Sequence, residues 1–274
     1  MIRNNPRAAR VAAFGDWGSA EDIIYDNWEE IDFDIPSLKA RQDVKFVYGL
    51  DFGYATSYNA FVAAAIEPLT HTMWIFDEMY EKGMTNIDIA RRITEKGYSK
   101  EVIYADSAEP KSIYELQQGL LELQEYEGET ITVRYALPNI RAALKGPDSV
   151  ANGIAKVQEY HIYVHPLCRN TIRELQNYAW AKDKDGRLTG KPEKEFDHLC
   201  DALRYSLSGE LLKGHGGVVE AKGMEHHHVM RVASSEPEPV NTLRQRQVVQ
   251  AIGPADAAPT KKRTVRIFSS VKAD

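Results

Sequence analysis

Three aspartates in this sequence occupy positions from which carboxylates can hold a metal ion. Asp51 closes the apolar run in GLDFG, Asp106 closes the one in YADS, and Asp201 lies within DHLCDALRY. An aspartate that directly follows several apolar residues is held where a buried strand ends, so its carboxylate is fixed and partly desolvated. If the two strands are neighbours, their carboxylates crowd together and require a cation or a proton.

Helical spacing near residue 200 adds polar side chains to this set. Asp197 and Asp201 are four residues apart and His198 and Asp201 are three apart, so all three share one face of a helix. Packed over the two strand ends, that face would close a cage of hard ligands suited to Mg²⁺ or Mn²⁺.

Such a cage indicates phosphodiester hydrolysis with two metal ions. One ion generates the attacking hydroxide and the other stabilises the leaving 3′-oxygen, with the ions about 3.5–4 Å apart. The predicted catalytic residues are Asp51, Asp106, Asp201 and His198, with Asp197 as a further candidate metal ligand. Each also has a purely structural interpretation, because an aspartate at a strand end commonly forms a turn, and Asp197 and His198 can cap the helix that follows. The metal hypothesis depends on finding all of them together.

The elements that must position these residues follow from hydrophobic periodicity and turn residues. In chain order the predicted elements are strands 45–53, 58–67 and 71–80, helix 86–97, strand 101–106, helix 109–120, strand 131–137, helix 148–160 with Asp148 as N-cap, strand 161–166, helix 168–180, a charged turn at 182–191 and helix 196–212. This order predicts an α/β, ribonuclease H-like fold with a central mixed sheet, three antiparallel strands followed by α/β alternation, flanked by helices. Order alone leaves other α/β folds open.

Composition divides the 274 residues into three parts. Residues 1–44 show little periodicity and predict a linker, residues 45–213 carry the regular pattern, and the Gly-, Pro- and Ser-rich residues 214–274 predict a flexible, mostly disordered tail. The net charge of −6 argues against a generic DNA-coating protein but leaves open an enzyme with clustered carboxylates. No run approaches the roughly 20 apolar residues of a membrane span. Cys168 and Cys200 predict reduced core residues.

Three strings resemble the nuclease domain of the terminase large subunit of tailed bacteriophages. They are GLDFGYATSYNAFVAA, YADSAEPKSI and FDHLCDALRYSL, and the likeness extends over about residues 45–212. The string GDWGSAEDIIYDNWEEI resembles the stretch that joins the ATPase to the nuclease domain. By this resemblance Asp51, Asp106 and Asp201 correspond to the metal-binding triad, and His198 to a residue near the metals in some members.

The resemblance implies a metal-dependent endonuclease that cuts concatemeric double-stranded DNA with two divalent cations, Mg²⁺ or Mn²⁺. The implied partners are double-stranded DNA, the terminase ATPase domain, the small terminase subunit and the portal protein, in the host cytoplasm during virus assembly, with no membrane. Candidate DNA phosphate contacts are Lys111, Arg141 and Lys145, with a solvated surface position as the alternative for each. The sequence contains no G-x-x-x-x-G-K-[ST] motif, so we expect the motor to have been removed or encoded separately.

Other functions stay open at this point. Another ribonuclease H-like nuclease, such as a resolvase, shares the carboxylate pattern, and the string DFG also resembles a phosphate loop of actin-like nucleotide binders. A non-catalytic module that docks on portal or DNA is the third alternative. The terminal segment KKRTVRIFSSVKAD could order on such a partner, although a disordered basic tail is the simpler interpretation. His226–His228 is at most an adventitious metal site.

Overall fold

A seven-stranded mixed sheet forms the centre of the protein. The structure is a computed structural model, and it describes residues 22–53 and 56–214. Neighbouring strands follow the order β1-β9-β4-β3-β2-β5-β8. The strands span β1 (Trp28–Glu30), β2 (Lys45–Asp51), β3 (Tyr58–Glu67), β4 (Thr72–Lys82), β5 (Ile103–Ala105), β8 (Arg141–Ala142) and β9 (His161–Val164). Strand β3 is antiparallel to β2 and β4, and the remaining pairs are parallel.

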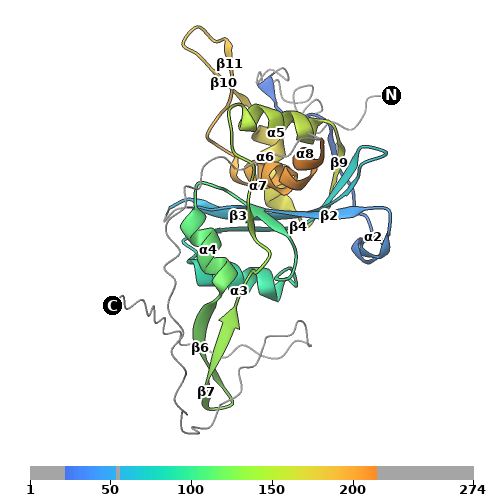
Figure 1. The fold of residues 1–274 in the computed structure, drawn as a ribbon. Helices are drawn as coiled ribbons and strands as arrows, with labels where there is room; N and C mark the ends of the chain where they lie inside the picture. Colours follow the sequence, from blue (N-terminus) through green and yellow to red (C-terminus); the bar gives the residue numbers. More distant parts are fainter. Residues whose placement is uncertain (1–21, 54–55, 215–274) are drawn as a thin grey trace, which may run out of the picture.

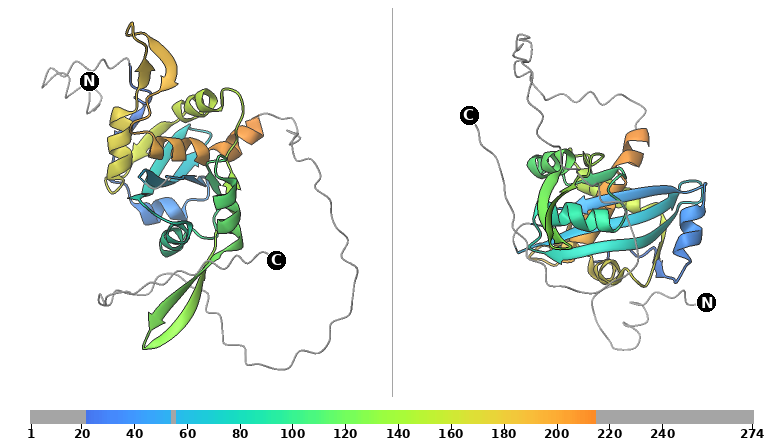
Figure 2. Two further views of the ribbon diagram at one scale, coloured as in Figure 1. Left: turned by 90° about the vertical axis from the view of Figure 1, so that its left-hand side faces the viewer. Right: turned by 90° about the horizontal axis from the view of Figure 1, so that it is seen from below.

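Helices cover both faces of this sheet. One face carries α3 (Asn86–Glu95) and α4 (Pro110–Gln118), and the other carries α5 (Ser149–Gln158), α6 (Arg169–Asn177), α7 (His198–Ser206) and α8 (Ser208–Gly214) (Figure 1). The short helix α2 (Ile35–Ala40) adds Leu38 to the core on the α3 side. In Figure 2 (left) the orange α7 crosses over the blue and cyan strands. The predicted mixed sheet with flanking helices is confirmed.

The central strand β3 shows why the sheet is buried on both faces. Ala60, Val62 and Ala64 point into the core under α7, whereas the alternating residues Phe61 and Ala63 point into the core over α3. All five are fully buried. A strand buried on both faces has no polar alternation, which explains the continuous apolar run in its sequence.

The strand predicted at 131–137 exists, but it does not belong to the main sheet. It is β7 (Glu129–Tyr135), which pairs with β6 (Leu120–Tyr126) in a separate hairpin that extends away from the body of the protein (Figure 1). Glu127 and Gly128 both have positive φ at its tip, as a tight two-residue hairpin turn requires. The sequence prediction ended a helix at residue 120 and missed β6, because β6 lacks the β-branched residues typical of strands.

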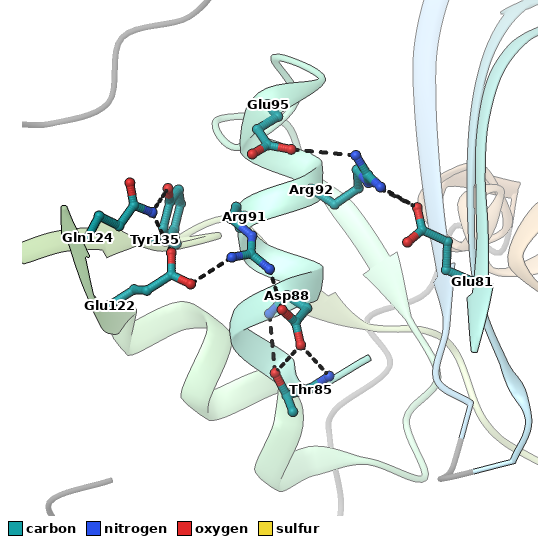
Figure 3. Close-up of polar contacts among 9 residues, drawn as sticks. All are labelled: Glu81, Thr85, Asp88, Arg91, Arg92, Glu95, Glu122, Gln124 and Tyr135. Atoms are coloured by element: carbon teal, nitrogen blue, oxygen red, sulfur yellow. Dashed lines mark hydrogen bonds and ion pairs between the residues drawn. The ribbon is translucent and has the colours of Figure 1, made fainter. Parts of the chain in front are cut away.

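The base of this hairpin is fixed to α3 by a buried ion pair (Figure 3). Arg91 Nη1 lies 2.6 Å from Glu122 Oε1, and the Glu122 side chain is 1% exposed. Gln124 donates to the hydroxyl of Tyr135 at 2.8 Å, and Arg91 also bonds Asp88 within the α3 capping box. The neighbouring Arg92 instead pairs with acidic side chains at the surface.

We expect Arg91→Met to loosen the hairpin without unfolding the sheet. The change leaves the buried Glu122 carboxylate without its cation, which costs about 3–5 kcal/mol, whereas Arg92→Met breaks only exposed pairs worth under about 1 kcal/mol. Hydrogen exchange of the β6 and β7 amides should accelerate in the Arg91 variant and stay unchanged in the Arg92 variant. Equal exchange in the two variants would show that the ion pair does not anchor the hairpin.

Three further expectations need correction. Asp148 stands at the N-cap of α5, but it has φ 60° and its side chain makes no capping hydrogen bond. The charged turn is the tip of a second hairpin, β10 (Trp180–Lys182) with β11 (Leu188–Pro192). The last helix ends at Ser206 and restarts at Ser208, so α7 and α8 are separate.

Part of the predicted linker packs into the fold. Trp28 lies in edge strand β1, and Tyr25 is fully buried in the core under α7. Cys168 and Cys200 are free thiols buried in the same core, as predicted. Residues 1–21 and 215–274, which include His226–His228 and the basic terminal segment, lie outside the described residues. None of the helices in the described ranges has the length and apolarity to cross a membrane.

Candidate active site

Asp51 and Asp106 lie at the ends of two adjacent parallel strands. Strand β2 ends at Asp51 and β5 ends at Ala105, with Leu50 opposite Ala105. The backbone N–H of Asp106 donates to the carbonyl of Leu50 at 3.1 Å and extends the pairing by one residue. Parallel strands end at one edge of the sheet, so the two aspartates emerge side by side, as the sequence predicted.

Helix α7 lies directly on β2 because of Gly49. A Cβ built on Gly49 would meet the carbonyl oxygen of Ala202 at 1.8 Å, so only a glycine permits this approach. Side chains alternate along a strand, so Asp51 shares the face of Gly49 and points toward α7. The predicted relation between the strand end and the helix is therefore present.

His198, in the first turn of α7, contacts Asp51. Its Nδ1 lies 3.0 Å from Asp51 Oδ2, and its Nε2 lies 2.9 Å from the Ser57 hydroxyl. The hydrogen bond to Asp51 raises the pKa of His198 above its usual value, although partial burial acts in the opposite direction. Ser57 was not among the predicted site residues. Its only sequence signal is its place within the string GLDFGYATSYNAFVAA.

Asp201 is held by an arginine one turn further along α7. Arg204 Nη2 lies 2.6 Å from Asp201 Oδ1, and Arg204 Nε also bonds this oxygen at 3.2 Å. The Arg204 side chain is 6% exposed and packs against Gly153 of α5. Burial raises the pKa of Asp201, and the charge of Arg204 limits the rise.

The three aspartates interact electrostatically. Burial raises the pKa of Asp51 to about 6, the negative charges of Asp201 and Asp106 add to the rise, and the hydrogen bond from His198 opposes it. The pKa of Tyr205 is also raised, first by burial and then by the charges of Asp201, Asp51 and Asp106. The negative charges of all three aspartates thus act on the Tyr205 hydroxyl, which indicates that the three carboxylates face one region.

The predicted closed metal cage is not formed by the contacts in the structure. Within residues 22–53 and 56–214, no group of three or more His, Cys, Asp or Glu side chains is close enough to hold a metal ion. Each aspartate has another partner: His198 for Asp51, the backbone N–H of Ala108 for Asp106, and Arg204 for Asp201. Asp197 makes no capping hydrogen bond, and its Oδ1 is 4.0 Å from His198 Nδ1. These residues stay predicted ligands.

The donor set nevertheless fits a divalent cation. Asp51 is 8% exposed and carries a raised pKa, so its ionised form lacks sufficient compensation from its surroundings. Carboxylate oxygens are the ligands that Mg²⁺ and Mn²⁺ prefer. A cation between these carboxylates would supply the missing compensation.

The three predicted phosphate contacts are on the surface. Lys111 lies in the first turn of α4, just after Asp106, with a side chain that is 88% exposed and 3.8 Å from Glu115. Arg141 is exposed in β8, and Lys145 is exposed beyond the end of that strand. Exposure agrees with both interpretations of these residues, so contact with DNA stays a prediction.

Comparison with known families decides the identity of this fold. The family model for the terminase RNase H-like domain matches residues 51–209, which include all three aspartates and His198. The chain belongs to this family. The ribonuclease H-like fold and the resemblance to the terminase large subunit, both predicted from the sequence, are thereby confirmed.

Curated relatives and a solved structure agree with this membership. The PBSX phage terminase large subunit of Bacillus subtilis (strain 168) is 35% identical over 167 residues, which are 59% of this chain and 34% of the relative. The terminase large subunit of Bacillus phage SPP1 is 29% identical over 168 residues, 61% of this chain and 36% of the relative. The chain therefore spans about a third of the length of these relatives.

The solved structure is the nuclease domain of the SPP1 large terminase, g2p, with bound Mn. It matches with a TM-score of 0.57 and 27% identity over 69% of this chain and 99% of that domain. The SPP1 nuclease domain is thus similar to the present chain, in both fold and sequence, over nearly all of the SPP1 domain's own length.

Proposed function

We propose that this terminase nuclease domain is a metal-dependent endodeoxyribonuclease that cuts concatemeric double-stranded DNA during viral genome packaging. One observation carries the proposal: Asp51 and Asp106 end adjacent parallel strands beneath the helix that carries His198 and Asp201. Membership in a nuclease-domain family and the Mn-bound relative support it.

Two bound divalent cations, Mg²⁺ or Mn²⁺, would supply activation of the attacking water and stabilisation of the leaving 3′-oxygen. Asp51, Asp106 and Asp201 would hold them, with Asp197 as a further ligand. Arg204 bonds Asp201 through Oδ1 and so fixes the direction of the carboxylate. His198 orients the Asp51 carboxylate through its Nδ1.

DNA is the proposed substrate and the terminase assembly the proposed setting. Lys111, Arg141 and Lys145 are exposed and would contact backbone phosphates, which position a duplex without reading its sequence. We propose that the chain acts with a terminase ATPase domain, a small terminase subunit and a portal protein, in the host cytoplasm. The large-subunit names of its relatives support the terminase assembly in general.

The test is cleavage of supercoiled plasmid by the purified chain with Mn²⁺, Mg²⁺ or EDTA. Nicking and linearisation that require the metal would support the nuclease. A folded sample that neither cleaves the plasmid nor binds metal would contradict it and favour a non-catalytic docking module.

The hydrogen-bond order Ser57–His198–Asp51 supports a second candidate, nucleophilic hydrolysis by Ser57. It has the order of a serine hydrolase triad, with distances of 2.9 and 3.0 Å. Metal-dependent cleavage needs no such nucleophile, so we expect Ser57→Ala to keep plasmid nicking within about tenfold of wild type, the lower end of an outer-shell effect. Loss comparable to removal of a triad nucleophile, on the order of 10⁴-fold or more, would instead support the serine mechanism. The exposed Ser37→Ala serves as the control.

Metal binding should depend on pH through Asp51. Its pKa is raised to about 6, so the carboxyl is protonated below that pH and ionised above it. A proton competes with the metal for the same oxygens, so Mn²⁺ affinity should fall by up to about tenfold per pH unit below the pKa and level off above it. Calorimetric titration with Mn²⁺ on both sides of pH 6 measures this. An affinity that does not change across this range would show that Asp51 is not a ligand.

A further inference from the structure

Helices α6 and α7 both begin without a capping side chain of their own. The N-cap residues are Cys168 for α6 and Asp197 for α7, and neither makes a side-chain capping hydrogen bond. The first backbone N–H groups of a helix have no partner within the helix, and leaving them unpaired in a buried position is costly. Their partners must therefore come from elsewhere in the fold.

For α7 the partner is a buried glutamate of α6. Oε2 of Glu174 accepts hydrogen bonds from the backbone N–H of Leu199 at 2.7 Å and of Cys200 at 3.1 Å. The Glu174 side chain belongs to the core, with 1% of its residue surface exposed. A carboxylate at this end of a helix also complements the helix dipole.

The start of α6 is satisfied in the same way by Glu78 of β4. Its carboxylate accepts from the backbone N–H of Asn170 at 3.0 Å and of Thr171 at 2.8 Å, and from both of their side chains. Two glutamates thus link the central sheet to α6 and α6 to α7. Only the link from Glu174 to α7 ends beside the candidate active site.

The position of the Glu174 bonds gives them a specific consequence. Leu199 and Cys200 lie between His198 and Asp201, so the carboxylate holds the one turn of helix that carries both site residues. Asp197, which would ordinarily cap this helix, makes no capping bond and stays near His198.

We propose that Glu174 is a positioning residue for the nuclease site: it caps α7 in place of Asp197, sets His198 and Asp201 against Asp51, and leaves Asp197 available to the site. The inference rests on the proposed function for its consequence in catalysis. Its structural part, a cap that determines where the first turn of α7 lies, is independent of cleavage.

The experiment compares Glu174→Ala and Glu174→Gln with the matched pair Glu78→Ala and Glu78→Gln. Glutamine keeps an acceptor oxygen and alanine does not. Both alanine variants should lower Tm by roughly 3 °C, because each loses a helix cap. We expect only E174A to lose Mn²⁺ affinity and nicking rate, by about 10–100-fold, the range for an outer-shell residue that orients ligands. E174Q and E78A should stay within about threefold of wild type.

Two results would overturn the proposal. If E174A loses stability but keeps Mn²⁺ affinity and nicking rate, as E78A does, Glu174 is a structural cap only. If E174Q loses as much Mn²⁺ affinity and nicking rate as E174A, the charge of Glu174 matters and not its hydrogen bonds to the start of α7. Should E174A fail to fold, Glu174→Asp withdraws the carboxylate from α7 by one methylene and carries the same expectation.

An activity-independent readout separates this inference from the proposed function. In the metal-free protein, NMR resonances of the His198 ring should shift further in E174A than in E174Q, which removes the same nearby charge. They should stay in place in E78A. Hydrogen exchange at Leu199 and Cys200 should accelerate in E174A alone. A wild type that neither binds Mn²⁺ nor cuts DNA would reject the proposed function, and these two measurements would still decide the role of Glu174. Unchanged ring resonances in E174A would reject that role.

Discussion

Asp51→Asn should reduce metal-dependent DNA cleavage by at least about 100-fold while the protein stays folded. Replacement of a residue that only orients metal ligands typically costs 10–100-fold, and a ligand itself should cost at least the upper end of that range. Asparagine has nearly the same shape and keeps an oxygen that can pair with His198 Nδ1. It removes the negative charge on which cation binding depends.

The same substitution should not destabilise the protein. The pKa of Asp51 is raised by burial, so its ionised form is less favourable in the folded chain than in the unfolded one. This cost is present above the folded pKa of about 6 and disappears as the pH falls below the unfolded value. Above pH 6 the metal-free Asp51→Asn protein should therefore have a Tm equal to or higher than that of the wild type.

Asp77→Asn is the matched control. Asp77 is also a strand aspartate with polar partners, Lys96 at 2.6 Å and the Tyr98 hydroxyl at 2.9 Å, but both belong to the segment that directly follows α3. Plasmid nicking, Mn²⁺ calorimetry and thermal unfolding of the two variants distinguish a ligand from a structural carboxylate. Full nicking activity in Asp51→Asn would remove Asp51 from the mechanism.

The parts of the site that the sequence predicted are those set by local pattern. An aspartate after an apolar strand marks a strand end, and a spacing of three or four residues marks one helix face. Asp51, Asp106 and the α7 residues emerged from these two rules alone. The order of the elements indicated a ribonuclease H-like topology but left other α/β folds open, and one of the predicted strands belongs to a separate hairpin.

The parts that the sequence did not predict depend on contacts between distant residues. Glu174 lies 25 residues before Leu199 in sequence and looks like any helical glutamate until the helices pack. Ser57 and His198 are separated by 141 residues. Arg204 is near Asp201 in sequence. Only the structure shows that Arg204 is buried under α5, where its guanidinium pairs with the Asp201 carboxylate. The pairing of polar side chains is a tertiary property, and periodicity does not show which partner a polar group will meet.

Gly49→Ala should lower Tm by roughly 10 °C or more, and cleavage should fall with it. Overpacking a core commonly costs about 1–3 kcal/mol, and about 1 kcal/mol shifts Tm by roughly 2–4 °C in a domain of this size. The expected cost exceeds that range because the obstructing atoms belong to the backbone of α7. The added Cβ would lie 1.8 Å from the Ala202 carbonyl oxygen and 2.9 Å from the Ser206 nitrogen, and neither can rotate away.

The helix can accommodate this methyl group only by moving off β2. That movement separates His198 and Asp201 from Asp51, so nicking should be lost even at temperatures where Gly49→Ala is folded. Gly146→Ala is the control, because a Cβ there meets no atom within 4 Å and the backbone lies outside the left-handed region. Thermal unfolding and plasmid nicking of the two variants test the argument. If Gly49→Ala matched Gly146→Ala in both, α7 would not require direct contact with β2, and the strand end and the helix would not form one site.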